Sequence, residues 1–201
     1  AVAGIARQLR QHRDADVEDA AMLAALGATL LDLLDLEGAI VTGDAAHCNH
    51  ETAQAIVDGK AFWLLTLKAN RGAAHEAAIA FFDAARARAF AGSKVRHHRT
   101  ENDGHGRHEI REGWSFPASE CPLPGEDWPG LSSVTFIERT RVVGVEASRE
   151  LHVSLSSLPP TVRRIMTSTR AHWSVENRLH WVLDVEMGED RCKVHDANAA
   201  T

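Results

Sequence analysis

Two short, nearly continuous apolar runs, each followed by a segment of helical periodicity, constrain the fold of this chain most strongly. The runs are residues 39–42 and 61–67, and the segments that follow them predict helices over Glu51–Val57 and Ala73–Phe90. Buried strands that alternate with helices are typical of βαβ units on a mostly parallel sheet. The sequence therefore predicts an α/β core, preceded by an amphipathic helix over Val17–Leu36.

The sequence changes character between residues 93 and 158. Glycine and proline recur there and separate short segments of high β-propensity, such as 134–137 and 151–154. We expect this stretch to form an antiparallel, β-rich insertion. Helical periodicity then returns over residues 162–166 and 170–185. These changes divide the chain into three predicted parts: a first core part (1–92), the insertion (93–158) and a C-terminal helical part of the core (159–201).

Charged residues are distributed unevenly along the chain, whose net charge is −6. Ten acids and no Lys or Arg lie between Asp14 and Asp58, whereas residues 86–111 contain seven Lys or Arg against three acids. A local excess of basic side chains is typical of a surface that contacts nucleic acid. We expect one surface of the molecule to bind anions and another to gather cations.

The sequence contains no sign of export or membrane insertion. No run reaches the ~18 apolar residues of a membrane span, and the first residues lack the order of a signal peptide. Cys48, Cys121 and Cys192 are far apart in the sequence, which suits a reducing compartment and argues against a disulfide framework. The sequence therefore predicts a cytoplasmic protein without a membrane partner.

Two carboxylates are candidates for catalytic chemistry. Asp44 follows the first apolar run, and the carboxyl ends of buried strands are where open α/β sheets place their ligands. Glu176 lies in a predicted helix, four residues after His172, so the two share one face. Two carboxylates from different elements suit a hard cation such as Mg²⁺ or Mn²⁺. The alternatives are that Asp44 only caps a turn and that Glu176 is only solvated.

Other polar residues allow weaker hypotheses. His47, Cys48 and His50 carry zinc-ligand chemistry, although no second ligand pair follows at a suitable spacing, and a polar loop explains them as well. Lys68 ends the second apolar run, and Arg107 lies beside a glycine in the basic stretch. Both can contact phosphate, and both can equally be solvated cations at a strand end or turn.

The order of these motifs resembles the H-repeat-associated group of bacterial insertion-sequence transposases. The resemblance is carried by Val41–Ala45, Trp63–Asn70, the turn His105–Arg107 with Glu109, Trp128–Leu131, Ser156–Pro159, His172–Val185 and Glu189–Asp190. The segment His172–Val185 is the most specific, because it holds many Trp, His and Glu positions in a fixed order.

The resemblance implies a ribonuclease-H-like mixed sheet with flanking helices and a β-rich insertion before the last catalytic helix. Such cores use an Asp-Asp-Glu triad and two divalent ions, Mg²⁺ or Mn²⁺, to cut transposon ends and join them to target DNA. By position, Asp44 corresponds to the second Asp and Glu176 to the Glu, both as catalytic residues and metal ligands. Lys68, Arg107 and Arg178 are the implied DNA contacts. The resemblance also implies a homo-oligomer during transposition.

The first Asp of the triad belongs to an upstream motif that this sequence does not contain. We therefore expect an internal piece or a decayed copy of a longer transposase, truncated at both ends and inactive or nearly so. The alternative from another class is a non-enzymatic DNA-binding remnant, which would bind DNA in a salt-dependent manner without metal-dependent nicking. A zinc-dependent hydrolase built on His47, Cys48 and His50 is the third hypothesis.

Overall fold

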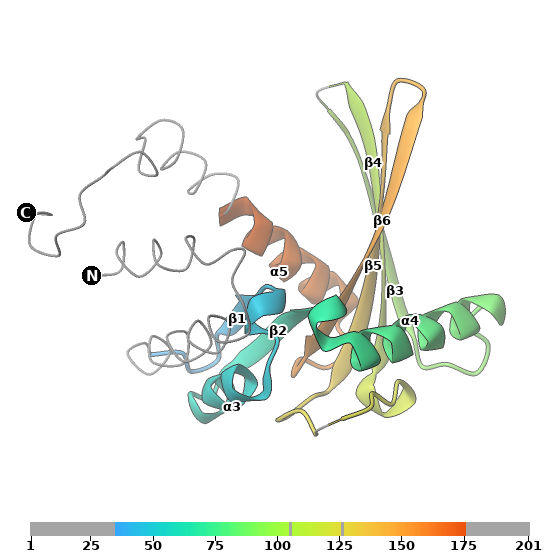
Figure 1. Cartoon of the computed structure of the whole chain (residues 1–201). Helices are drawn as coiled ribbons and strands as arrows, with labels where there is room; N and C mark the ends of the chain where they lie inside the picture. Colours follow the sequence, from blue (N-terminus) through green and yellow to red (C-terminus); the bar gives the residue numbers. More distant parts are fainter. Residues whose placement is uncertain (1–34, 105, 126, 176–201) are drawn as a thin grey trace, which may run out of the picture.

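In the computed structural model, which describes residues 35–104, 106–125 and 127–175, six strands form a single mixed sheet (Figure 1). The strand order is β1-β2-β6-β5-β4-β3; only the β1–β2 pair is parallel, and the other four neighbouring pairs are antiparallel. The strands are β1 (Ile40–Gly43), β2 (Phe62–Leu67), β3 (Arg96–Gly104), β4 (Arg107–Pro117), β5 (Ser133–Val143) and β6 (Glu146–Ser156). The α/β class is confirmed, whereas the expectation of a mostly parallel sheet is correct for β1 and β2 alone.

Helices cover both faces of the inner half of this sheet (Figure 1). One face packs on α3 (His50–Asp58) and α4 (Gly72–Ala87), and the other on α5 (Val162–Val175). Alternate residues of β2 supply the two sides: Trp63 and Leu65 lie in the core with α3 and α4, while Leu64 packs with Ile165 of α5. This alternation follows from the period of two of a strand. It explains why residues 61–67 are apolar almost without interruption.

The helix boundaries have local causes. Asn49 caps α3, and its Oδ1 accepts a hydrogen bond from the backbone N–H of Thr52 at 2.8 Å. The helix predicted to reach Phe90 ends earlier, because Ala89 and Phe90 adopt positive φ angles of 49° and 61°. Phe90 instead turns back so that its ring lies 6.0 Å from that of Trp114. The two segments predicted after residue 158 are one continuous helix, α5, as far as the structure describes it.

The predicted β-rich stretch forms two long antiparallel hairpins, β3–β4 and β5–β6, which extend the sheet of β1 and β2. Their strands are 9 to 11 residues long, longer than the short segments that the sequence suggests. The outer parts of these hairpins project beyond the helices (Figure 1). We call residues 98–104, 106–112 and 138–150, which begin where the strands meet the ends of the helices, the hairpin arm. No helix in the described ranges is long and apolar enough to cross a membrane.

Three short 3-10 helices complete the described structure: η1 (Ala45–His47), η2 (Ala69–Arg71) and η3 (Ala118–Glu120). The first two begin immediately beyond the carboxyl ends of β1 and β2. Because β1 and β2 are parallel neighbours, η1 and η2 lie at the same edge of the sheet. This edge carries two of the residues that the sequence singles out, Asp44 and Lys68.

Candidate functional site

Asp44 lies at the carboxyl end of β1 and is exposed. Its Oδ1 accepts a hydrogen bond from the backbone N–H of Ala46 at 3.1 Å and so caps η1. The capping role is therefore real, but it uses one carboxylate oxygen. Within the described part of the chain, no hydrogen bond occupies the other oxygen of Asp44. A solvent-facing carboxylate at a strand end can accept a ligand in addition to its structural bond.

The ends of β1 and β2 are tied together by two side-chain bonds. Asn70 Nδ2 donates to the Ala45 carbonyl at 2.6 Å, and Arg71 Nε donates to the Cys48 carbonyl at 3.1 Å. Both donors belong to η2 and both acceptors to the segment that begins with η1. Sequence reasoning assigned no role to Asn70 and Arg71. Their position directly after the second apolar run is the signal that points to a strand-end role.

Lys68 follows β2 and is exposed. It lies beyond the Leu67–Val153 pair of β2 and β6, and its charge lowers the pKa of His152, although burial of His152 is the largest cause of that shift. Lys68 thus ends the strand next to the one that leads to Asp44, as predicted. A lysine at this edge can bind an anion that also approaches the strand ends.

The last turns of α5 reach the same edge of the sheet. His172 Nδ1 lies 3.0 Å from Thr42 Oγ1, and the ring of Trp173 lies 6.3 Å from the ring of His152. Thr42 faces the α5 side of β1, two residues before Asp44, which lies beyond the end of the strand. Gly43 between them faces the other way, where an added Cβ would stand 2.8 Å from Leu65 Cδ2. Close packing of β1 on β2 therefore requires glycine at this position.

One sequence-predicted site residue lies away from this edge, and two are outside the described residues. Arg107 is exposed at the start of β4, and three strands, β2, β6 and β5, separate β4 from β1. Glu176 and Arg178 lie outside the described residues, as do the rest of residues 176–185 of the His172–Val185 segment and Glu189–Asp190. Most of the helix predicted over Val17–Leu36 lies outside them as well.

The zinc hypothesis at His47, Cys48 and His50 is wrong for the described residues. Cys48 is 1% exposed and belongs to the apolar core, and burial raises the pKa of its thiol to about 12, an effect that the charge of Arg71 opposes. A zinc ion would have to enter the apolar core and displace the proton of this thiol, because the thiolate is the ligand. The ring of His50 packs near Trp128, with centroids 5.4 Å apart. Residues 35–104, 106–125 and 127–175 contain no group of three His, Cys, Asp or Glu side chains that could hold a metal ion.

The mixed sheet and its strand-end aspartate can now be compared with known proteins. The family described as "Transposase DDE domain" matches residues 8–201, and the chain belongs to this family of DDE transposases. It is similar to relatives of the insertion-sequence type. One is the H repeat-associated putative transposase YhhI of Escherichia coli K12, 31% identical over 181 residues. Others are the putative protein YbfL of the same strain, 32% identical over 181 residues, and the putative transposase YncI of Escherichia coli O157:H7, 34% identical over 176 residues.

These similarities cover 85% of this chain and 44–46% of each relative. The chain therefore spans a little less than half the length of the curated relatives that it matches. No solved structure gives a significant match to it.

Proposed function

We propose that this chain is a part of the ribonuclease-H-like catalytic core of an insertion-sequence transposase, which cuts transposon ends and joins them to target DNA with the help of divalent metal ions. The family match supports the transposase assignment. The observation that carries the proposal is the convergence at one sheet edge of Asp44, Lys68 and the His172 end of α5. These elements come from three separate stretches of the sequence.

Asp44 and Glu176 are the proposed metal ligands. The exposed Asp44 carboxylate is of the oxygen-donor type that Mg²⁺ or Mn²⁺ prefers. Support for Glu176 is indirect, from helical spacing. His172 contacts Thr42, and residues four apart in a helix share a face. Glu176 follows His172 by four residues in the sequence, the spacing that puts two side chains on one face of a helix.

Each residue then has a defined task in the proposed reaction. Two bound ions would activate the attacking oxygen and stabilise the leaving oxygen of a phosphodiester. Asp44 supplies negative charge at the strand end, and its capping bond to Ala46 fixes the direction of the carboxylate. Lys68, on the neighbouring strand, binds the phosphate, and Arg178 is a further proposed phosphate contact. Arg107 contacts DNA away from this edge, as its place on β4 requires.

The resemblance assigns the first Asp of the triad to a motif that this sequence lacks. We therefore propose that the 201-residue chain by itself cleaves DNA poorly or not at all. A pair of ions with one ligand fewer would be held less firmly in line. Binding of metal and binding of DNA are the properties that this chain can display alone.

Asp44→Asn tests the metal assignment in the 201-residue chain. Asn is as good an N-cap as Asp, so the variant removes the charge and keeps the local fold. We expect Mn²⁺ binding, measured by electron paramagnetic resonance, to weaken by more than the ~10-fold that loss of an outer-shell partner typically costs. Asp83→Asn, at an exposed position on α4, is the matched control and should leave Mn²⁺ binding unchanged.

Equal Mn²⁺ binding by wild type and Asp44→Asn would contradict the metal assignment. Salt-dependent DNA binding that persists in that case would favour the non-enzymatic DNA-binding alternative. In a complete protein that contains this segment, Asp44→Ala or Glu176→Ala should abolish cleavage, and retained cleavage would rule out the catalytic roles.

A further inference from the structure

The register of the sheet gathers arginines on one face of the hairpin arm. Gly113 of β4 faces α5, because an added Cβ would stand 2.5 Å from Met166 Sδ. Residues at intervals of two share a face, so Arg111 and Arg107 face the same way. Arg139 lies directly opposite Arg111 on β5, and Arg141 lies opposite Glu109. We call this side of the arm its α5 face.

The helix adds a further cation to this face. Arg170 of α5, together with Arg139 and Arg107, acts electrostatically on Arg111. Burial is the largest cause of the lowered pKa of Arg111, the three neighbouring guanidinium groups lower it further, and Glu109 opposes the shift. Three guanidinium groups are therefore close enough to Arg111 to act on its charge.

Acidic residues on the α5 face neutralise it only in part. Glu109 pairs with Arg111 at 2.6 Å, and Glu150 pairs with Arg139 at 2.5 Å and with His152 at 3.1 Å. Arg107 and Arg141 have no ion-pair partner in the part of the chain that the structure describes, although the register also puts Glu146 on this face, opposite Val143. Arg111 Nη1 is buried, and no hydrogen-bond acceptor in the described residues reaches it. A buried N–H without an acceptor is costly, whereas the Arg111 side chain as a whole is 22% exposed, so an anionic oxygen can reach this guanidinium from its exposed side.

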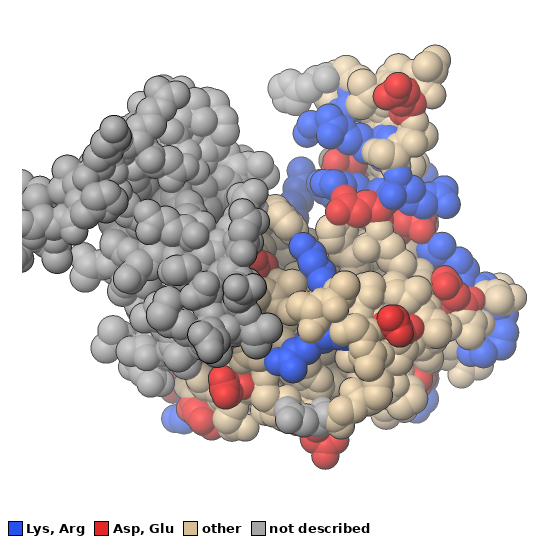
Figure 2. Space-filling view, in the orientation of Figure 1, with Lys and Arg blue, Asp and Glu red and all other residues tan. Residues whose placement is uncertain are grey.

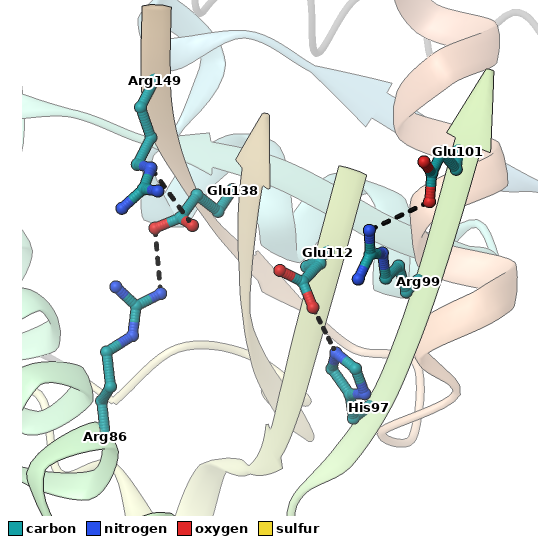
Figure 3. Close-up of polar contacts among 7 residues, drawn as sticks. All are labelled: Arg86, His97, Arg99, Glu101, Glu112, Glu138 and Arg149. Carbon is teal, nitrogen blue, oxygen red and sulfur yellow. Dashed lines mark hydrogen bonds and ion pairs between the residues drawn. The ribbon is translucent and has the colours of Figure 1, made fainter. Parts of the chain in front are cut away.

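The opposite face of the arm has a different charge pattern (Figure 3). There, Arg86 pairs with Glu138 at 3.0 Å, Arg99 with Glu101 at 2.9 Å, and Arg149 with Glu138 at 3.7 Å. His97 also contacts Glu112, at 3.3 Å. Each arginine drawn on this face has an acidic partner. The excess of unpaired cations therefore belongs to the α5 face.

We propose that Arg107, Arg111, Arg139, Arg141 and Arg170 form a binding face for the phosphate backbone of duplex DNA. The proposal rests on the transposase function for the identity of the polymer. The extended shape of the face favours a polymer over a single small anion. The four residue steps from Arg107 to Arg111 span about 13 Å along β4, enough for more than one phosphate in succession. In Figure 2, basic side chains are visible along the projecting arm, with acidic side chains between them.

The test compares two double variants of the 201-residue chain with the same change in charge. Arg107→Gln with Arg141→Gln removes exposed cations from the α5 face, and Arg99→Gln with Arg149→Gln removes exposed cations from the opposite face. The probe is a fluorescently labelled duplex, and anisotropy gives the binding constant from about 50 to 200 mM salt. Circular dichroism checks that each variant is folded.

We expect the α5-face pair to flatten the slope of log K against log salt by about 1.8, since each lost phosphate contact reduces it by about 0.9. The opposite-face pair should change the slope by less than half as much. Adding Arg170→Gln to the α5-face pair should flatten it by a further ~0.9. Equal changes of the salt slope in both double variants would overturn the assignment of DNA binding to this face. They would not contradict DNA binding itself or the proposed function. Absence of any DNA binding by the wild-type chain would overturn the proposal that the α5 face binds DNA. The Mn²⁺ measurement on Asp44→Asn would still test the strand-end metal site independently.

Discussion

The inner half of the sheet and the hairpin arm share the strands β3–β6, but they are stabilised differently. In β5, residues 133–137 are buried, whereas residues 138–143 are half-buried or exposed. The inner half packs between helices and holds large apolar side chains such as Phe116 and Phe136. The arm has strand hydrogen bonds and ion pairs, and exposed ion pairs contribute little to stability. The free energy of unfolding therefore resides mainly in the inner half, which leaves the arm free to carry charge for binding.

Removing an aromatic ring from the inner half should have the largest effect. Phe82 is fully buried, and its ring stacks on Phe136 with centroids 4.4 Å apart. Phe82→Ala should lower the free energy of unfolding by about 3–5 kcal/mol, because the cavity cannot close around a rigid sheet. Urea unfolding followed by circular dichroism measures it. Val145→Ala, at the fully exposed tip of the arm, should stay within ~0.5 kcal/mol of wild type. Similar losses at both positions would contradict the division of stability between the two regions.

Two glycines in neighbouring strands sharpen the comparison. Gly113 of β4 lies under α5, and an added Cβ would stand 2.5 Å from Met166 Sδ and 3.0 Å from Val162 Cγ2. Gly113→Ala should therefore destabilise the fold by about 1–3 kcal/mol as α5 is displaced. Gly104 of β3 has nothing within 4 Å of an added Cβ, so Gly104→Ala should be neutral within ~0.5 kcal/mol. Urea unfolding measures the change in the free energy of unfolding for both variants. No change for Gly113→Ala would show that α5 does not pack closely against β4 at this position.

The same division explains how much of the fold could be predicted from the sequence. The strands β1 and β2 were recognisable because burial on both faces makes residues 39–42 and 61–67 almost wholly apolar. The outer parts of β3–β6 carry polar residues on both faces, so no hydrophobic period reveals their length. The continuity of α5 was hidden by Thr167 and Thr169, residues of low helix propensity. Their hydroxyls donate to the carbonyls of Arg163 and Ile165, at 3.0 Å each, which satisfies them within the helix.

The candidate site was predictable to a similar degree. The ends of apolar runs correctly put Asp44 and Lys68 at the ends of neighbouring strands, while their roles and those of Glu176 and Arg178 stay predictions. The tie from Arg71 to Cys48 depends on loop geometry that has no sequence period. The arginine face depends on the pairing of Arg111 with Arg139, and strand register over long hairpins does not follow from local composition.

The smallest expected effect compares a histidine of the arm with one beside the helix-covered half. The hydrogen bond between His108 and Asp103 raises the pKa of His108. The stability that this bond contributes is therefore complete below the ordinary pKa of about 6.5, and it is lost as pH rises through the raised pKa of the folded state. Burial lowers the pKa of His152, so its contribution is complete above about 6.5 and is lost as pH falls. Urea unfolding between about pH 5 and 8.5 should give difference curves of opposite slope for His108→Gln and His152→Gln. Parallel difference curves would mean that the pKa values of the two histidines shift in the same direction on folding. The contrast between the arm and the inner half of the sheet would then not hold for these two residues.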